Sequence, residues 1–320
     1  MKVFVTGATG FIGSAVTSEL LRAGHEVAGL VRSSESAERL KGMGATPVSG
    51  SVEDLDVLKR AAADADGVIH TAFFHGFSQP SLGTRLGIIF GGSPAGIVGR
   101  FMTAAVEADR RAIETFGSAL RGRDSALVIA FPTMAMRQGG FADEDDLADP
   151  RAAGGVRARS EQTTLALASA GLRACVVRLP PSVHDETKLG LVTQLVTIAR
   201  KKGVSAFVGD GANRWGAGHR LDAAHLFRLA IEGGEAGGRY HAAAENMPFR
   251  AIAETVGRDV GVPVRSMSPE EAKRHFGWLT PFVAADNPVS SQKTQARLSW
   301  RPQNPSLLPD LAAHLRRPVR

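Results

Sequence analysis

Cysteine and long apolar runs are both scarce in this sequence of 320 residues. The single cysteine, Cys175, excludes a disulfide framework and a thiol-rich metal site. The nine histidines and the carboxylates do not fall at metal-ligand spacing, so we predict that the protein holds no metal. No window reaches about 18 uninterrupted apolar residues, and the first residues lack the basic-then-apolar profile of a signal peptide. We therefore predict a soluble, cytoplasmic protein without a membrane partner.

Charge of one sign is not concentrated in one stripe of the chain. The formal net charge is +6, but the basic residues are spread along the sequence, apart from a short basic run at 314–320. This pattern is typical of a solvated basic surface, and we predict no nucleic-acid partner. Hydrophobic residues make up 43% of the sequence and charged residues 22%, which supports a full core and excludes a disordered chain.

Strand-like and helix-like stretches alternate through the first half of the chain. Predicted strands cover residues 2–6, 26–31, 45–48, 67–71, 126–131 and 173–179, and predicted helices cover 11–23, 36–43, 54–63, 101–121 and 160–169. The alternation predicts an α/β fold, a Rossmann-type doubly wound parallel sheet with helices on both faces. We expect an NADP(H)-binding domain over 1–184, to which some later strands return, and a smaller C-terminal substrate-binding lobe over 185–320.

Residues 76–100, which are rich in Gly, Ser and Pro, interrupt this alternation. We predict a loop here, and a loop of this length is usually functional or mobile. Two interpretations remain open: a flap beside the substrate mouth, or an inserted surface excursion. Five glycines and a proline interrupt the apolar residues of Gly87–Gly99, which argues against a membrane anchor.

A glycine-rich turn follows the first predicted strand. Gly7, Gly10 and Gly13 are spaced three apart where that strand meets an amphipathic helix. The first glycine permits a tight turn, the second lets the backbone approach a pyrophosphate, and the third lets the helix pack against the strand. The pattern predicts a dinucleotide site that also includes the intervening residues Thr9, Phe11 and Ile12.

The spacing Thr-Gly-x-x-Gly-x-x-Gly resembles that of the short-chain dehydrogenase/reductase superfamily. Later segments resemble, in order, motifs of its extended branch, the NAD-dependent epimerase/dehydratase-like proteins: Val-Ile-His-Thr-Ala at 68–72, Arg-Leu-Pro-Pro-Ser-Val-His at 178–184, His-Arg-Leu-Asp at 219–222 and Leu-Ser-Trp-Arg-Pro at 298–302. The resemblance spans roughly residues 1–310, with 76–100 as the chief mismatch. It implies that the adenine lies near Ser51 and Val52, the ribose near Thr71, Ala72 and Phe73, and the nicotinamide near Pro180, Ser182 and Val183.

The end of the second predicted strand favours NADP(H) over NAD(H). An enzyme that prefers NAD usually has a carboxylate there, which accepts a hydrogen bond from the ribose 2′-hydroxyl. This chain has Arg32, followed by the hydroxyls of Ser33 and Ser34. A guanidinium and two hydroxyls bind a 2′-phosphate, which a carboxylate would repel. An exposed loop arginine without a ligand is the alternative.

The Tyr-x-x-x-Lys pair that the family uses for proton transfer is not apparent. The one tyrosine, Tyr240, lies far past the expected place and is followed four residues later by Ala244. The resemblance instead aligns Arg157 with the tyrosine and Glu161 with the lysine. A plain ion pair on a helix surface is the other interpretation of these two residues.

Other groups must therefore polarise the substrate or move the proton. Arginine is permanently protonated, so Arg157 suits the binding of a carbonyl or an anion rather than acid catalysis. Thr133 supplies a hydroxyl just after the fifth predicted strand and is the second candidate for polarising the substrate. His75 and His184 are the candidates for the proton donor, because histidine titrates near neutral pH, and Glu161 is a further one.

The predicted substrate pocket is lined by Phe73, Phe74, Phe77, Met134 and Trp215, together with the 76–100 segment. This lining suits a hydrophobic small molecule better than a nucleotide sugar. Our leading hypothesis is an atypical NADP(H)-dependent reductase that acts on a hydrophobic carbonyl or imine compound, as a monomer or homodimer.

Two alternatives remain open. The first is a redox-neutral cyclase, dehydratase or isomerase with the same fold, which keeps the nucleotide or has lost it. The second is a protein that senses NADP(H) and performs no chemistry.

Overall fold

Residues 1–316 are described in a computed structural model, in which the chain divides into two compact units. Unit 1 consists of Met1–Phe131, Val156–Val177 and Ala224–Arg239. Unit 2 consists of Pro132–Gly155, Arg178–Ala223 and the chain from Tyr240 onward. This discontinuous division differs from the single boundary predicted at residue 184.

A seven-stranded sheet has the strand order β10-β6-β5-β4-β1-β2-β3. Its strands are β1 (Lys2–Thr6), β2 (Glu26–Val31), β3 (Thr46–Ser49), β4 (Gly67–His70), β5 (Ala126–Pro132), β6 (Arg173–Leu179) and β10 (Arg239–His241). The pairs β1–β2, β2–β3, β1–β4 and β4–β5 are parallel. The predicted α/β parallel sheet is confirmed, and β10 is a late strand that returns to it.

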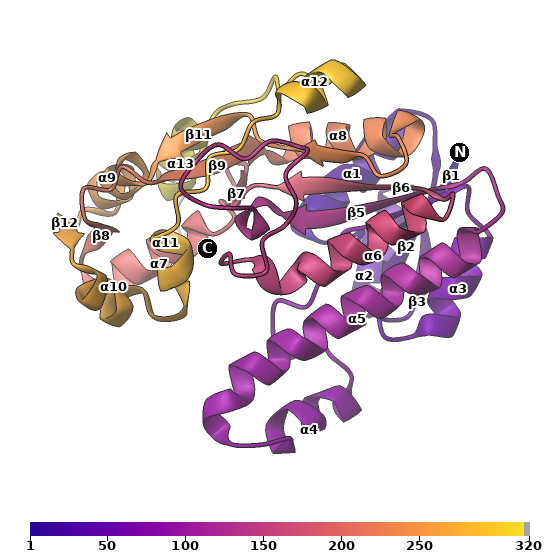
Figure 1. Ribbon diagram of the computed structural model, residues 1–320, viewed down its shortest axis with the longest axis horizontal. Helices are drawn as coiled ribbons and strands as arrows, with labels where there is room; N and C mark the ends of the chain where they lie inside the picture. Colours follow the sequence, from indigo (N-terminus) through magenta and orange to yellow (C-terminus); the bar gives the residue numbers. More distant parts are fainter. Residues whose placement is uncertain (317–320) are drawn as a thin grey trace. The chain divides into compact units, whose positions relative to one another are not determined.

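Helices connect the strands of unit 1, and those predicted over 11–23 and 101–121 bury the apolar face that their sequence periodicity predicts. The helices of this unit are α1 (Phe11–Arg22), α2 (Ser34–Gly42), α3 (Leu55–Ala63), α4 (Leu82–Phe90), α5 (Ile97–Leu120), α6 (Ala158–Ser169) and the later part of α8 (Arg220–Gly233). In α1, for example, Val16 and Leu20 are fully buried, and in α5 Ile113 and Phe116 are. Helix α5 packs beside both α3 and α6 (Figure 1).

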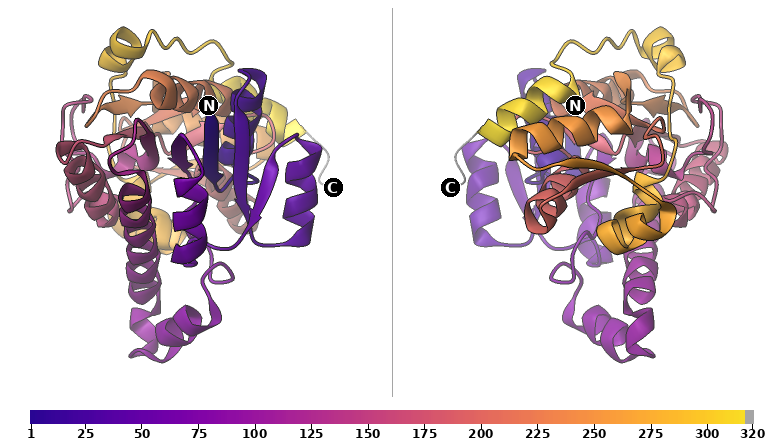
Figure 2. Two further views of the ribbon diagram at one scale, coloured as in Figure 1. Left: turned by 90° about the vertical axis from the view of Figure 1, so that its right-hand side faces the viewer. Right: turned by 90° about the vertical axis from the view of Figure 1, so that its left-hand side faces the viewer.

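The 76–100 segment is helical, so the predicted loop is wrong. Ser81 begins α4 by accepting a hydrogen bond from the Thr84 N–H at 3.3 Å, and a short 3₁₀ turn, η1 (Pro94–Gly96), leads into α5. Helix α4 folds back along the first part of α5, and both views in Figure 2 show this hairpin extending away from the strands of unit 1. Six large apolar side chains of the segment are exposed: Phe77, Leu82, Leu86, Ile89, Phe90 and Val98.

Unit 2 contains two small sheets with the strand orders β11-β9-β7 and β12-β8. Its strands are β7 (Ser182–His184), β8 (Ser205–Val208), β9 (Arg214–His219), β11 (Glu245–Pro248) and β12 (Val264–Met267). Its helices are α7 (Val192–Lys202), α9 (Phe249–Val260), α10 (Pro269–Phe276), α11 (Thr280–Val283), α12 (Gln292–Leu298) and α13 (Leu307–Arg316). A large apolar cluster lies in its core, where Trp215 and Phe249 meet edge to face with ring centroids 4.9 Å apart.

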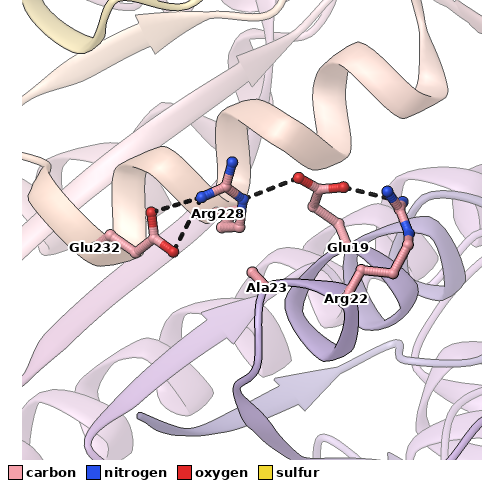
Figure 3. A pocket seen from close by; sticks show the side chains of 5 residues that line it. All are labelled: Glu19, Arg22, Ala23, Arg228 and Glu232. Carbon is pink, nitrogen blue, oxygen red and sulfur yellow. Dashed lines mark hydrogen bonds and ion pairs between the residues drawn. The ribbon is translucent and has the colours of Figure 1, made fainter.

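An ion-pair chain holds the later part of α8 against α1 in unit 1. Arg228 donates to Glu19 at 2.9 Å and pairs with Glu232 on its own helix, while Glu19 also pairs with Arg22 (Figure 3). These side chains and Ala23 line a hollow of about 370 Å³. Because the charged side chains that line the hollow already pair with one another, we interpret it as part of the contact between α1 and α8 and not as a ligand site.

Within residues 1–316, no helix is both long enough and apolar enough to cross a membrane.

Candidate functional site

The predicted phosphate turn lies between β1 and α1 and has the geometry that its glycines suggest. Gly7 has φ +71°, where a side chain is strained, and a Cβ on it would lie 2.8 Å from the Thr71 hydroxyl. A Cβ on Gly13 would lie 2.0 Å from the Gly7 carbonyl oxygen. Gly10 stands at the N-cap and gives α1 no side-chain cap. The bare N-terminus of α1 is therefore suited to an anion, as the pattern predicts.

Arg32 and Ser33 follow the carboxyl end of β2, and both side chains are exposed. Arg32 Nη1 donates to the Gln79 carbonyl oxygen at 3.1 Å, and Ser33 caps α2 by accepting from the Ser36 N–H at 3.2 Å. This turn thus presents a guanidinium beside a helix N-terminus, and residues 32–34 contain no carboxylate.

The residues predicted to flank the adenine, Ser51 and Val52, lie after β3. The Ser51 hydroxyl accepts from the Glu53 N–H at 3.2 Å, and its own N–H donates to Asp54 at 2.6 Å. Val52 is 7% exposed. These contacts form a compact turn that leads into α3.

A buried polar chain runs across the carboxyl ends of β1 and β4. Asp109 of α5 accepts from His70 Nε2 at 3.2 Å, and the other ring nitrogen, Nδ1, lies 2.6 Å from the Thr6 hydroxyl. The Thr6 hydroxyl oxygen accepts from the Ala72 N–H at 3.3 Å, so the chain reaches the segment after β4.

Arg157 completes this chain from the start of α6. Its Nη2 donates to both carboxylate oxygens of Asp109 at 3.2 Å and to the Ala130 carbonyl oxygen at 2.9 Å. Burial by itself raises the pKa of Asp109, but the charge of Arg157 and the hydrogen bond from His70 outweigh it and lower the pKa to about 2. Asp109 is therefore a buried carboxylate held ionised by its partners.

The surface ion-pair interpretation of Arg157 and Glu161 is wrong. The Arg157 side chain is 14% exposed and Glu161 is 1% exposed, so neither lies on an open helix surface. Arg157 stands at the N-cap of α6, and its guanidinium carbon lies 4.3 Å from the centroid of the Phe73 ring. His75, which is exposed, meets the same ring edge to face, with centroids 5.5 Å apart. Three predicted site residues, Phe73, His75 and Arg157, are thus brought together in unit 1.

His184 lies in unit 2 and has a carboxylate partner that the sequence did not indicate. Its Nδ1 donates to Asp310 of α13 at 2.7 Å, and the His219 Nε2 lies 3.7 Å from the same carboxylate oxygen. Burial lowers the pKa of His184, although Asp310 acts in the opposite direction. With Nδ1 protonated, the neutral ring presents Nε2 as an acceptor. That atom and the Ser182 hydroxyl are buried without a hydrogen-bond partner among the described residues.

Three further predicted residues are engaged in the interior of unit 2. The Thr133 hydroxyl donates its proton to Asn287 Oδ1 at 3.0 Å, which argues against its polarising a carbonyl. Met134 and Trp215 belong to the apolar core, and the Trp215 indole donates to the Phe282 carbonyl oxygen at 3.0 Å. Of the two interpretations of Trp215, pocket wall or core, the contacts favour the core.

The remaining predicted residues divide between the units. Phe74 is buried in unit 1, where Phe77 stacks on Phe101 with centroids 5.0 Å apart. Pro180, Ser182 and Val183 lie in unit 2 and are all buried.

Sequence reasoning missed the partners Asp109 and Asp310. His70 stands within the fourth-strand motif, but neither aspartate lies in a motif that singles it out. Only the packing of α5 and α13 identifies them.

Comparisons with known proteins are consistent with a nucleotide site at the phosphate turn. A family model described as NAD(P)H-binding matches residues 7–90. An uncharacterized protein of Schizosaccharomyces pombe is 44% identical over 319 residues, which cover 98% of this chain and 99% of that protein. A 2-alkyl-3-oxoalkanoate reductase of Stenotrophomonas maltophilia is 27% identical over 280 residues, 82% of this chain and 77% of that protein.

Among solved structures, DesIV, a dTDP-glucose 4,6-dehydratase from Streptomyces venezuelae with NAD and TYD bound, has a TM-score of 0.71 at 20% identity. The match covers 99% of this chain and 96% of that chain. Together with the glycine turn and the parallel sheet, these relationships show that the chain belongs to one family with the Schizosaccharomyces pombe protein, contains an NAD(P)H-binding domain and has the fold of the extended short-chain dehydrogenases/reductases, the NAD-dependent epimerase/dehydratase-like proteins.

Proposed function

We propose that this protein is an NADP(H)-dependent reductase of a hydrophobic carbonyl or imine compound. The observation that carries the NADP(H) preference is Arg32 beside Ser33 and the N-terminus of α2, where an NAD-preferring site has a carboxylate. A 2′-phosphate would receive charge-assisted hydrogen bonds from the Arg32 guanidinium.

The residues of unit 1 fit the dinucleotide. The Gly7 and Gly13 positions leave no room for a Cβ, and the uncapped start of α1 suits the pyrophosphate. When bound, the nicotinamide supplies a hydride donor or acceptor. The protein's own contribution is to bind and orient the nucleotide and the substrate and to supply a proton.

The substrate class follows from the side chains near the end of β4. Phe73, Phe74 and Phe77 are apolar, and the Arg157 guanidinium, held against the Phe73 ring, can donate a hydrogen bond to a neutral oxygen. His75 is exposed beside the same ring and is the candidate for the proton donor on this side of the site. The name of the Stenotrophomonas relative, a 2-alkyl-3-oxoalkanoate reductase, describes a ketone substrate that carries alkyl groups beside a carboxylate, and it supports a carbonyl substrate with an apolar part.

The test is a calorimetric titration with NADPH, NADP⁺ and NADH, followed by NADPH consumption with ketones, aldehydes and imines. We expect NADPH to bind at least tenfold more tightly than NADH, and Arg32→Glu to reverse this preference. The matched control is Arg39→Glu, on an exposed position of α2. Equal affinity for NADPH and NADH would refute the assignment to Arg32, and binding without turnover of any compound would favour a sensing protein.

A redox-neutral enzyme is the second candidate, and the His184–Asp310 pair favours it. A neutral imidazole whose Nδ1 is bound to a carboxylate presents Nε2 as a base, which suits proton abstraction in an isomerisation or dehydration. Product formation without net NADPH oxidation, abolished in His184→Gln, would select this candidate over the reductase.

A further inference from the structure

The ends of β1 and β4 mark the place in unit 1 where a nucleotide is expected to lie. The chain passes from β1 to β2 and β3 on one side, and β4 then pairs with the other side of β1. Parallel α/β sheets bind ligands at the carboxyl ends of the strands where the order reverses in this way. Thr6 and His70 are the last residues of these two strands, and both belong to the buried chain that ends at Arg157.

The phosphate turn is continuous with Arg157 through the segment after β4. A Cβ on Gly7 would touch both the Thr71 hydroxyl at 2.8 Å and the Ala72 N at 3.0 Å, so the two backbones are in close contact. Phe73 comes next, and its ring lies against the Arg157 guanidinium. The part of a dinucleotide that follows the pyrophosphate therefore meets this segment and Arg157.

The Arg157 guanidinium has donor capacity that the described residues do not use. Its Nη2 is occupied by Asp109 and the Ala130 carbonyl oxygen, whereas its Nε is buried and has no hydrogen-bond partner among the described residues. A buried donor without a partner is costly, and in native structures such an atom is satisfied by an ordered water, an ion or a bound ligand.

The charge of the cluster indicates which acceptor fits. The Asp109 carboxylate balances the Arg157 charge, so the pair brings no net charge to the site. A balanced guanidinium is suited to a neutral oxygen such as a sugar hydroxyl, while phosphates are left to the glycine turn and Arg32.

From these contacts we infer that Arg157 binds a hydroxyl of the nicotinamide ribose and that Asp109 is the positioning residue that fixes its guanidinium. The inference rests on the proposed binding of a nicotinamide nucleotide. It assigns to an Arg–Asp pair the place at which the family pattern has tyrosine and lysine.

The experiment compares three ligands that differ in how far they extend. NADPH and 2′-phospho-ADP-ribose both contain the second ribose, whereas 2′,5′-ADP ends before it. Their affinities are measured by calorimetry for the wild-type protein and for Arg157→Gln, Arg157→Lys and Asp109→Asn. The matched control is Arg159→Gln, which removes an exposed charge two residues further along.

We expect Arg157→Gln to lower the affinity for NADPH and 2′-phospho-ADP-ribose about tenfold, because one charge-assisted hydrogen bond is lost. The affinity for 2′,5′-ADP should not change. Asp109→Asn should act on the same two ligands. Arg157→Lys keeps the charge opposite Asp109, and therefore the fold, but loses the planar donor group, so it should reproduce the pattern. Arg159→Gln should change no affinity.

Equal losses of affinity for all three ligands would overturn the inference, and so would unchanged affinities in both Arg157→Lys and Arg157→Gln. Either result would leave Arg157 and Asp109 as a purely structural ion pair. A wild-type protein that binds none of the three would overturn the proposed function itself.

Discussion

The buried Asp109–Arg157 pair makes a strong prediction about stability. In Asp109→Asn the carboxylate is replaced by an amide of the same shape, and the Arg157 guanidinium loses its counter-charge. Breaking a buried ion pair from one side typically costs about 3–5 kcal/mol. Because asparagine keeps one acceptor oxygen, we expect a loss of about 2–4 kcal/mol in the free energy of unfolding at pH 7.

The pKa of Asp109 gives the same order of magnitude. A change from the usual 3.8 to about 2 corresponds to roughly 2–3 kcal/mol of preferential stabilisation of the charged form. Since the folded pKa lies below the unfolded one, this contribution is present above pH 3.8 and is lost as the pH falls through about 2. The difference between wild type and variant should therefore shrink over that window.

Urea unfolding followed by far-ultraviolet circular dichroism measures this effect. Circular dichroism is preferred to tryptophan fluorescence, since Trp215, Trp278 and Trp300 all lie in unit 2 and Asp109 lies in unit 1. Glu114→Gln is the control, because Glu114 is exposed on the same helix and should cost less than about 0.5 kcal/mol. A loss below about 0.5 kcal/mol in Asp109→Asn at pH 7 would refute the reasoning.

Three further predictions concern other parts of the molecule. Trp215→Ala should lower the free energy of unfolding by about 3–5 kcal/mol, whereas Trp278→Ala, at a position 62% exposed, should change it by less than about 0.5 kcal/mol, both measured by urea unfolding. The stability of unit 2, followed by tryptophan fluorescence, should decline as the pH falls below 6.5, because the folded protein keeps His184 neutral while the unfolded chain binds a proton there. The variant His184→Gln should show a smaller decline, and a pH profile identical to that of the wild type would contradict the assignment. Gly13→Ala should weaken the binding of NADPH at least tenfold in calorimetry, since its Cβ would lie 2.0 Å from a backbone oxygen of the phosphate turn. The control Gly42→Ala, whose Cβ would have nothing within 4 Å, should leave the affinity for NADPH unchanged.

Local sequence patterns predicted most elements of the sheet and its helices. The strands β1, β2 and β6 have the predicted bounds, and α1 begins at the predicted Phe11. These features depend on neighbouring residues alone: side-chain alternation in a strand, the helical repeat, and glycines at a strand–helix turn.

The α4–α5 hairpin shows where local reasoning failed. Glycines and two prolines, Pro80 and Pro94, favour a loop over 76–100, and glycine is costly inside a helix. A helix nevertheless forms over Leu82–Phe90, where Ser81 caps its N-terminus and α4 packs on α5. Tertiary contacts of this kind commonly override weak helix propensity.

Short-range patterns are enough to predict the Rossmann-type sheet, the phosphate turn with Gly7, Gly10 and Gly13, and a turn after the second strand that has Arg32 and no carboxylate, because each is a property of one short stretch of chain. The partners of the buried charges, by contrast, follow from the tertiary packing. Arg157 and Asp109 are hydrogen-bonded although they lie 48 residues apart in the sequence, and His184 and Asp310 although they lie 126 residues apart. A charge requires a specific partner once both groups leave water, and which groups leave water together is decided by the packing of distant helices and strands.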